Sequence, residues 1–181
     1  MSSNYSDKFL LASSLAGDEE AFGKLYDKYV NDIFRFICMR IRSREEAQDL
    51  TSEAFLKTWQ YVSKKDTKVD NFRALLYRIA RNIVIDHYRK SGHEMLAIDE
   101  AQFDLIEDKE LGIEDKLKHK DDMRVVRKAL ENLNSEEQEL IAMKYIQDLS
   151  TKEIAQITGK KSGSVRVALH RAIKRLKQEL K

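Results

Sequence analysis

The sequence predicts an all-α protein: two small helical domains joined by a flexible acidic linker, the C-terminal domain being a helix-turn-helix. The 181-residue chain has no proline and only six glycines, so long helices meet few breakers. Average usage of about 5% would give roughly nine prolines in a chain of this length. Hydrophobic residues make up 42% of the chain and charged residues 35%, which suits packed cores beneath a strongly charged surface.

The first domain, which we expect to span residues 1–91, contains helices that begin at recognisable caps. Ser6 can cap a short helix that ends at Gly17. Asp18 can cap a longer helix whose apolar residues follow one another at helical spacing. Ser43 and Glu46 have the spacing of a capping box, which predicts the start of a third helix.

The last helix of this domain is the first of two basic helices. A polar loop at 63–71 ends in Asn71, which can cap a helix from Phe72 to about Lys90. Its cations, together with Tyr77 and the amide of Asn82, suit contact with unpaired nucleic-acid bases. From the residues alone, an amphipathic core helix whose arginines reach solvent is an equally good interpretation. The candidate DNA-binding residues are Arg73, Tyr77, Arg78, Arg81 and Asn82.

The amino-acid composition changes in the centre of the chain. Residues 92–120 contain nine acids and four lysines without a sustained apolar period, which predicts a flexible linker with a helix beginning near Glu114. The second domain is expected at 121–181 and starts with a helix that ends near Leu133. Two capping boxes follow, and they are formed by Ser135 with Gln138 and by Ser150 with Glu153.

A short helix from Thr151, a turn at Gly159 and a longer basic helix give the pattern of a helix-turn-helix. From Gly159 to Lys181 there are eight Lys or Arg and one acid, although the whole chain has a formal net charge of only +2. Such concentrated charge indicates a polyanionic partner, with an ordinary solvated face as the alternative. We expect Ser162 or Ser164 to cap the last helix. Its outward side is expected to bind DNA through Ser164, Arg166, Val167, His170, Arg171 and Lys174.

The helix after Ser43 has an acidic and aromatic face that carries Asp49, Glu53 and Trp59. Paired carboxylates can act in acid–base catalysis, but no His, Ser or Lys is spaced as a partner for them here. The pattern suits a protein-docking helix better, and an ordinary solvated face is the alternative.

Several functional classes are excluded by what the sequence lacks. Cys38 is the single cysteine, so no intrachain disulfide can form. The four histidines lack the spacing of a metal site, and no nucleophile elbow or dinucleotide-binding loop occurs, so we expect no metal, no cofactor and no enzyme. Without a signal peptide or a run of 18 apolar residues, the chain is expected to be cytoplasmic, without membrane insertion.

Three stretches, taken in this order, resemble the extracytoplasmic-function (ECF) sigma factors of the sigma-70 superfamily. They read DLTSEAFLKTW at 49–59, NFRALLYRIARNIVIDHYRK at 71–90 and LNSEEQELIAMKYIQDLSTKEIAQITGKKSGSVRVALHRAIKRL at 133–176. The resemblance covers roughly residues 21–90 and 121–180. Any one stretch could occur in a generic DNA-binding domain, but their order and separation are specific.

The resemblance implies a non-enzymatic factor that directs core RNA polymerase to promoter DNA. In that case the first stretch docks on the polymerase through Asp49, Glu53 and Trp59. The second melts and reads the −10 element, with Tyr77, Arg78 and Asn82 near an unpaired base. The third reads the −35 element in the major groove through the outward side of the last helix. An anti-sigma partner is implied by the family alone.

The sequence departs from the family pattern at two places, and two alternative functions remain open. The family often has Trp where Leu75 stands, and Gly or an aromatic residue in the loop at 64–69, so the −10 preference is expected to be weak or unusual. A stand-alone helix-turn-helix regulator is the first alternative, although residues 1–90 show no sensor pattern. A metal-dependent nuclease using Asp49 and Glu53 is the second, and it lacks a third carboxylate.

Overall fold

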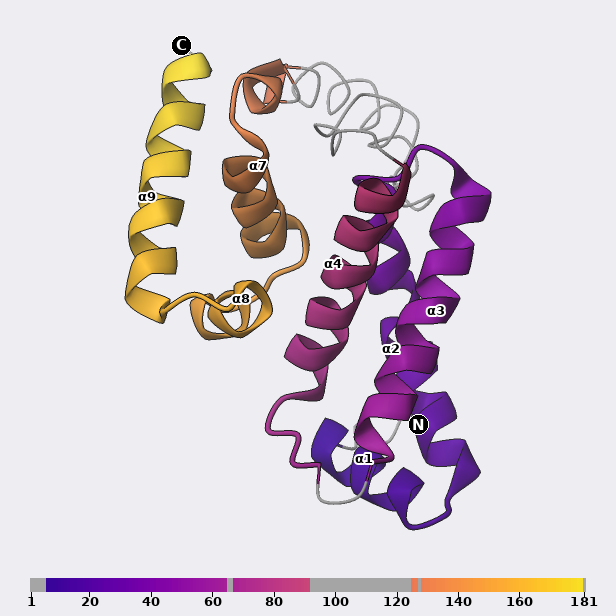
Figure 1. The fold of residues 1–181 in the computed structure, drawn as a ribbon. Coiled ribbons are helices and arrows are strands. Elements are labelled where there is room, and N and C mark those ends of the chain that lie inside the picture. Colours follow the sequence, from indigo (N-terminus) through magenta and orange to yellow (C-terminus); the bar gives the residue numbers. More distant parts are fainter. Residues whose placement is uncertain (1–5, 65–66, 92–124, 127, 181) are drawn as a thin grey trace, which may run out of the picture.

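A computed structural model describes residues 6–64, 67–91, 125–126 and 128–180 (Figure 1). All regular structure within these ranges is helical, which confirms the all-α prediction for them. The elements are α1 (Asp7–Leu15), α2 (Glu19–Cys38), α3 (Arg44–Val62), α4 (Phe72–Ser91), α7 (Ser135–Ile141), the π-helix η1 (Ala142–Ile146), α8 (Thr151–Thr158) and α9 (Ser162–Glu179). Residues 125–126 and 128–131 are also helical. The predicted linker at 92–120, and the helix start near Glu114, lie outside the described residues.

Helices α1 to α4 pack into one body, called the N-terminal unit below. Both α3 and α4 lie against α2, and α1 packs on α2 and α4 (Figure 1). The centre of this unit is fully buried and consists of side chains such as Leu25, Ile33, Phe36 and Leu76. The helix faces that form this core are therefore the ones on which apolar residues recur at helical spacing in the sequence.

Residues 125–131, α7, η1, α8 and α9 form the C-terminal unit. Helices α7 and α8 pack on α9, as in a helix-turn-helix. Val165, Leu169 and Ala172 bury the inner side of α9. Val125, in the helical residues that precede α7, is 53% exposed.

The predicted caps are confirmed at most helix starts. The side chains of Ser6, Asp18, Ser43 and Asn71 each accept a backbone N–H of the following turn. The capping box of Ser150 with Glu153 is present in both directions. Gly159 ends α8 with φ +70°, the left-handed conformation that favours glycine.

Two predicted caps are wrong. The box at α7 is formed by Asn134 and Glu137 rather than by Ser135 and Gln138. Gln138 is buried instead, and its amide donates to the carbonyls of Leu130 and Leu133. The last helix has Lys161 at its N-cap position, with no side-chain cap, so neither Ser162 nor Ser164 has that role.

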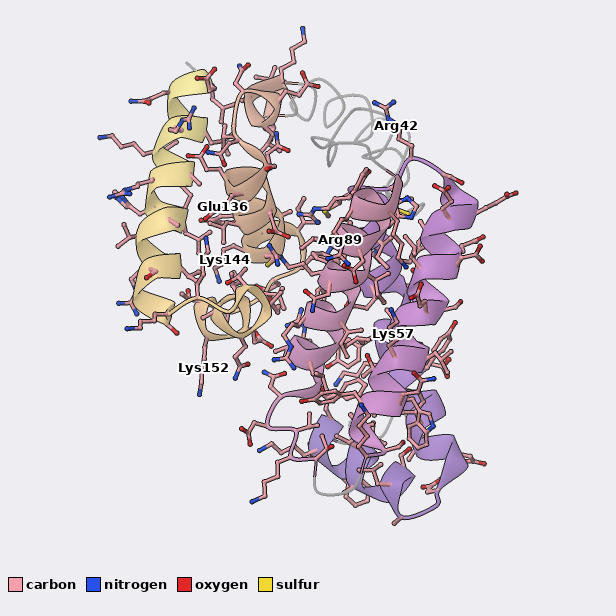
Figure 2. All side chains as sticks on the ribbon, viewed as in Figure 1. Arg42, Lys57, Arg89, Glu136, Lys144 and Lys152 are labelled. Atoms are coloured by element: carbon pink, nitrogen blue, oxygen red, sulfur yellow. The ribbon has the colours of Figure 1, made fainter. Side chains whose placement is uncertain are left out.

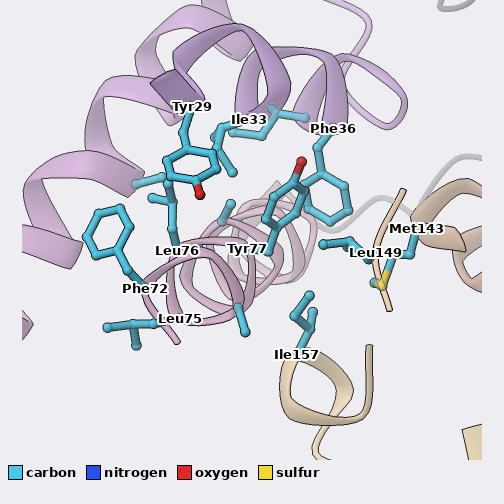
Figure 3. Close-up of a cluster of buried hydrophobic side chains, with 14 of the residues drawn as sticks. Tyr29, Ile33, Phe36, Phe72, Leu75, Leu76, Tyr77, Met143, Leu149 and Ile157 are labelled. Atoms are coloured by element: carbon cyan, nitrogen blue, oxygen red, sulfur yellow. The ribbon is translucent and has the colours of Figure 1, made fainter. Parts of the chain in front are cut away.

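The two units share a hydrophobic core cluster. Helix α8 packs across α4, and Met143, Leu149 and Ile157 of the C-terminal unit approach Tyr77 of α4 (Figure 3). At the other end of the contact, Met39 lies in a cluster with Ile141 and Ala172, although it belongs to the N-terminal unit. Helix α4 is thus covered on one side by the N-terminal unit and on another by the C-terminal unit, two segments that lie far apart in the sequence. Among the described helices, none is long and apolar enough to cross a membrane.

Candidate nucleic-acid interface

The outer side of α9 is open to solvent along its length. All six residues predicted there are exposed, and they are Ser164, Arg166, Val167, His170, Arg171 and Lys174. Val167 is 51% exposed, so the surface includes an apolar position between its cations. Cations flank an apolar group here, and such a surface can hold phosphates and contact a base edge.

The helix-turn-helix geometry holds this surface in place. The left-handed Gly159 turns the chain between α8 and α9, and the amide of Lys160 donates to the carbonyl of Ala155 at 3.1 Å. One guanidinium nitrogen of Arg175 donates to both carboxylate oxygens of Glu137 in α7, at 2.8 and 3.1 Å. Lys160 pairs with Glu136 of α7. Ion pairs within the unit thus use cations at its edges and leave the six outward residues of α9 exposed.

Helix α4 divides the predicted −10 residues between two faces. Arg78 and Asn82 are exposed on the side of α4 that faces the C-terminal half of α3. Arg78 lines a cavity of about 180 Å³ together with Tyr61, Val69 and Asn71. Gln156 of α8 also lines this cavity, so the C-terminal unit closes part of it.

The other predicted −10 residues of α4 lie against the C-terminal unit. Tyr77 is completely buried, and its hydroxyl donates to Gln147 Oε1 at 2.7 Å. Its ring meets that of Phe36 edge-on, with centroids 5.2 Å apart. Burial raises the pKa of Tyr77, which therefore stays protonated as a donor. Arg73 donates to the carbonyl of Gln147 at 2.5 Å and to that of Asp148 at 3.4 Å.

The strained turn after η1 presents those two carbonyls to Arg73. Asp148 has φ +46°, an uncommon conformation for a residue with a side chain. Arg73 also lies 3.9 Å from the carboxylate of Glu153, and Asn71 donates to that carboxylate at 3.4 Å. Burial favours the neutral form of Glu153, but hydrogen bonds from Ser150 and Asn71 and the charge of Arg73 outweigh it, so its pKa is lowered.

The last of the three, Arg81, belongs to a buried charge cluster that sequence reasoning missed. Its guanidinium forms two hydrogen bonds to the carboxylate of Glu139 in α7, at 3.0 and 3.1 Å. Arg40, only 4% exposed, lies 3.4 Å from the same carboxylate. Burial lowers the pKa of Arg40, and the charge of Glu139 opposes that effect. Neither Arg40 nor Glu139 carries a sequence signal, because each lies among other charged residues of its own segment and nothing local indicates that it is buried.

The predicted docking face of α3 is accessible. Asp49 is exposed, and Glu53 is partly exposed and pairs with Lys57 one turn later at 2.7 Å. Figure 2 labels Lys57 on α3. Trp59 is half-buried, with its ring 4.8 Å from that of Phe22. Trp59 also lines an apolar hollow of about 510 Å³ beside Leu56, which is 56% exposed. The acids and this apolar surface lie on one broad outer side of α3, which suits a protein partner.

No group of three His, Cys, Asp or Glu residues that could hold a metal ion occurs in the part of the chain that the structure describes. Among those described residues, Asp49 and Glu53 therefore do not belong to such a group.

Comparison with known proteins assigns the two units to a family. Residues 25–94 match the family model of Sigma-70 region 2, and residues 123–176 match that of Sigma-70, region 4. ECF RNA polymerase sigma factor BldN of Streptomyces coelicolor is 32% identical over 167 residues, which cover 92% of this chain and 63% of BldN. ECF RNA polymerase sigma factor SigW of Bacillus subtilis is 27% identical over 176 residues, which cover 91% of each chain. The chain is an ECF sigma factor.

The fold of this chain is similar to that of a solved structure as well. The sigma factor RpoE from Bartonella quintana, solved with the anti-sigma factor NepR, matches with a TM-score of 0.62 at 21% identity. The match covers 88% of this chain and 96% of the other, and it concerns the fold alone. As an ECF sigma factor, the protein is a non-enzymatic factor of transcription initiation. The family favours this role over the stand-alone regulator and over the nuclease.

Proposed function

We propose that this sigma factor binds core RNA polymerase through the outer side of α3 and reads promoter DNA with two helices. Asp49, Glu53 and Trp59 contribute to the polymerase contact, with the apolar surface of Leu56 beside them. Helix α4 acts on the −10 element, where Arg78 lines the cavity that would take an unpaired base and Asn82 lines a neighbouring one between α3 and α4. The protein acts in the cytoplasm, together with the polymerase.

Helix α9 reads the −35 element in the major groove. The observation that carries this proposal is that a helix-turn-helix presents six exposed residues, all predicted from the sequence, on the side of α9 opposite its core. Arg166 or Arg171 would read guanine, and Lys174 would hold a phosphate. We assign domain boundaries at 1–91 and 121–181, with 92–120 as the linker.

A sequestering anti-sigma factor is part of this proposal. The structurally similar RpoE was solved with such a partner, and this chain offers an apolar hollow around Trp59 for a protein contact. We expect that partner to compete with the polymerase for the same side of α3.

The proposal is tested by run-off transcription with purified core polymerase on a library of genomic promoter fragments. We expect transcripts only when this protein is added, from promoters that share −10 and −35 elements. Specific nanomolar binding of duplex DNA by the isolated protein, without any transcription on adding core polymerase, would support a stand-alone regulator instead.

A further inference from the structure

The outer side of α9 carries one apolar side chain among its cations. Of the residues of α9, all of which the structure describes, only Val167 is a large hydrophobic residue that is exposed, with 51% of its surface open to solvent. Val167 follows the buried Val165 by two residues, which is about 200° around an α-helix. Val167 therefore lies opposite the core of the C-terminal unit, at the centre of the proposed DNA-reading surface.

The fold itself gives no reason for this valine. Exposed helix positions favour residues such as Ala, Lys or Glu, whereas valine loses side-chain freedom against the preceding turn. One turn earlier, Gly163 is exposed on the same side of α9, and a Cβ atom there would meet no other part of the fold within 4 Å. The φ of Gly163 is not positive, so neither packing nor backbone conformation requires glycine. Both positions thus carry residues that the helix alone disfavours.

These two positions suit a close approach to DNA bases. Recognition helices contact base edges through their N-terminal residues, and Gly163 and Val167 lie in the first two turns of α9. A glycine allows the helix backbone to come near a partner. A valine side chain keeps mostly one χ1 rotamer in a helix, so it loses little conformational freedom when it makes a contact. Val167 is thus a rigid apolar group on the part of α9 that is proposed to meet the bases.

Unmodified base pairs present one apolar group in the major groove, the C5-methyl group of thymine. The other groups on the base edges are hydrogen-bond donors and acceptors, which Arg166, His170 and Arg171 can meet and valine cannot. A contact between valine and the methyl group removes both apolar groups from water, which is favourable. Uracil lacks this methyl group, and 5-methylcytosine has one at the same ring position. The methyl group can therefore be removed or added without a change in base pairing.

We propose that Val167 reads the C5-methyl group of one pyrimidine in the −35 element. In unmodified DNA that pyrimidine is thymine. A cytosine there is a poor substitute, and methylation at its C5 restores the part of the recognition that Val167 contributes. Promoter choice by this sigma factor therefore responds to cytosine methylation at one base pair. This inference rests on the proposed function of α9 and adds an apolar contact to the hydrogen bonds proposed for its arginines.

The test varies the methyl group in the DNA and the valine in the protein. Core polymerase with the full-length sigma factor transcribes one promoter obtained from the run-off library. Each thymine of its −35 element, on either strand, is replaced in turn by uracil. At the position that responds, the T·A pair is then replaced by C·G, with either cytosine or 5-methylcytosine. The run-off rate is measured at limiting polymerase, so that it reports the affinity for the promoter.

The perturbing variant is Val167→Ala, which removes the two γ-methyl groups of the proposed contact and suits the helix. The matched control is Val125→Ala, because Val125 is 53% exposed, belongs to the same unit and lies outside α9. The two variants thus lose the same atoms from equally exposed positions. Circular dichroism and thermal unfolding identify any variant that fails to fold.

With the wild-type chain, we expect uracil at one position to lower the rate about fourfold, the factor that corresponds to one buried methyl group. The rate with 5-methylcytosine should exceed that with cytosine by the same factor. Val167→Ala should bring both ratios to about one, and Val125→Ala should leave both at about four. Any effect of the methyl group on DNA shape is the same for every variant, so the change in the ratio measures the contact with Val167.

Two results would overturn the proposal. The first is a wild-type rate that no uracil lowers. The second is a folded Val167→Ala variant with the same ratios as the wild-type chain, since the methyl group then acts without Val167. Scrambling the whole −35 element distinguishes these failures from a failure of the proposed function. If scrambling lowers transcription, reading of the −35 element stands and only the role of Val167 is lost. If scrambling has no effect, the proposed function of α9 fails, and this inference fails with it.

Discussion

Replacing Arg166 or Arg171 by alanine tests how α9 reads DNA. Both side chains are exposed on the side of α9 opposite Val165 and Leu169. Neither forms an ion pair with another described residue, so truncation breaks no ion pair within the described fold. Any loss of activity is then attributable to DNA.

The expected magnitude follows from the geometry of guanine recognition. An arginine that donates two hydrogen bonds to one guanine contributes about 1–3 kcal/mol of discrimination. At about 1.4 kcal/mol per tenfold change, this is roughly a 5- to 150-fold loss at one −35 position, with relaxed base preference there. Lys174→Ala or Lys177→Ala should instead weaken all promoters alike and lower the salt slope by about one unit.

The assay compares each variant on promoters that carry all four bases at every −35 position, with core polymerase present. Arg175→Ala is the matched control, since Arg175 lies on the same helix but binds Glu137 at 2.8 Å. We expect it to lower stability by at most about 1 kcal/mol and to leave base preference unchanged. If both Arg166→Ala and Arg171→Ala lose activity uniformly at every base, these arginines only hold phosphates. Reading would then belong to Ser164, Val167 and His170.

Three further predictions concern the docking face, the single thiol and the turn of the helix-turn-helix. Asp49→Arg combined with Glu53→Arg should slow association with core polymerase and alter its salt dependence while leaving thermal unfolding within about 0.5 kcal/mol of wild type; undiminished co-purification would remove both residues from the interface. Cys38 is completely buried, and burial raises its pKa to about 11, so a thiol reagent at pH 8 should label it only as fast as the protein unfolds; rapid labelling of native protein would contradict this. Gly159→Ala should destabilise the protein by about 1–2 kcal/mol in urea unfolding, because φ is +70° at this position and alanine is strained there. No atom lies close enough to clash with the added methyl group, so backbone strain is the only expected cause. Gly163→Ala, in the first turn of α9 and equally uncrowded, is its control and should not destabilise; equal losses in both variants would rule out backbone strain as the cause.

Local features of this fold could be predicted from the sequence because their causes are local. A cap such as Asp18, or the box of Ser150 with Glu153, involves residues within three positions of each other. The same holds for the outward side of α9, since helical spacing alone separates Val165 and Leu169 from the exposed residues. The error at α7 is a shift of one residue, from Ser135 to Asn134, which are both good cap residues.

The contact between the units could not be predicted in this way. Arg81 and Glu139 are 58 residues apart, and Tyr77 and Gln147 are 70 apart. No periodicity in one helix says which other helix will cover it. The sequence left two interpretations of α4 open, a DNA-reading helix and a core helix with arginines at its edge. In the structure, the face of Arg73, Tyr77 and Arg81 fits the second interpretation, while Arg78 and Asn82 are exposed.

The Glu139 cluster has a consequence for chimeric sigma factors. In the proposed promoter complex the two units would contact elements about 25 base pairs apart, on the order of 85 Å at ~3.4 Å per base pair, so exchanging one unit for that of a relative should alter only the element it reads. In the free protein, exchanging the C-terminal unit would place the donor's residue at position 139 against Arg40 and Arg81 of this chain. A donor with leucine there would leave both guanidinium groups without their buried counter-charge, and a donor with glutamate would keep the ion pairs. The two units are therefore interchangeable as readers of DNA but matched to each other as a pair.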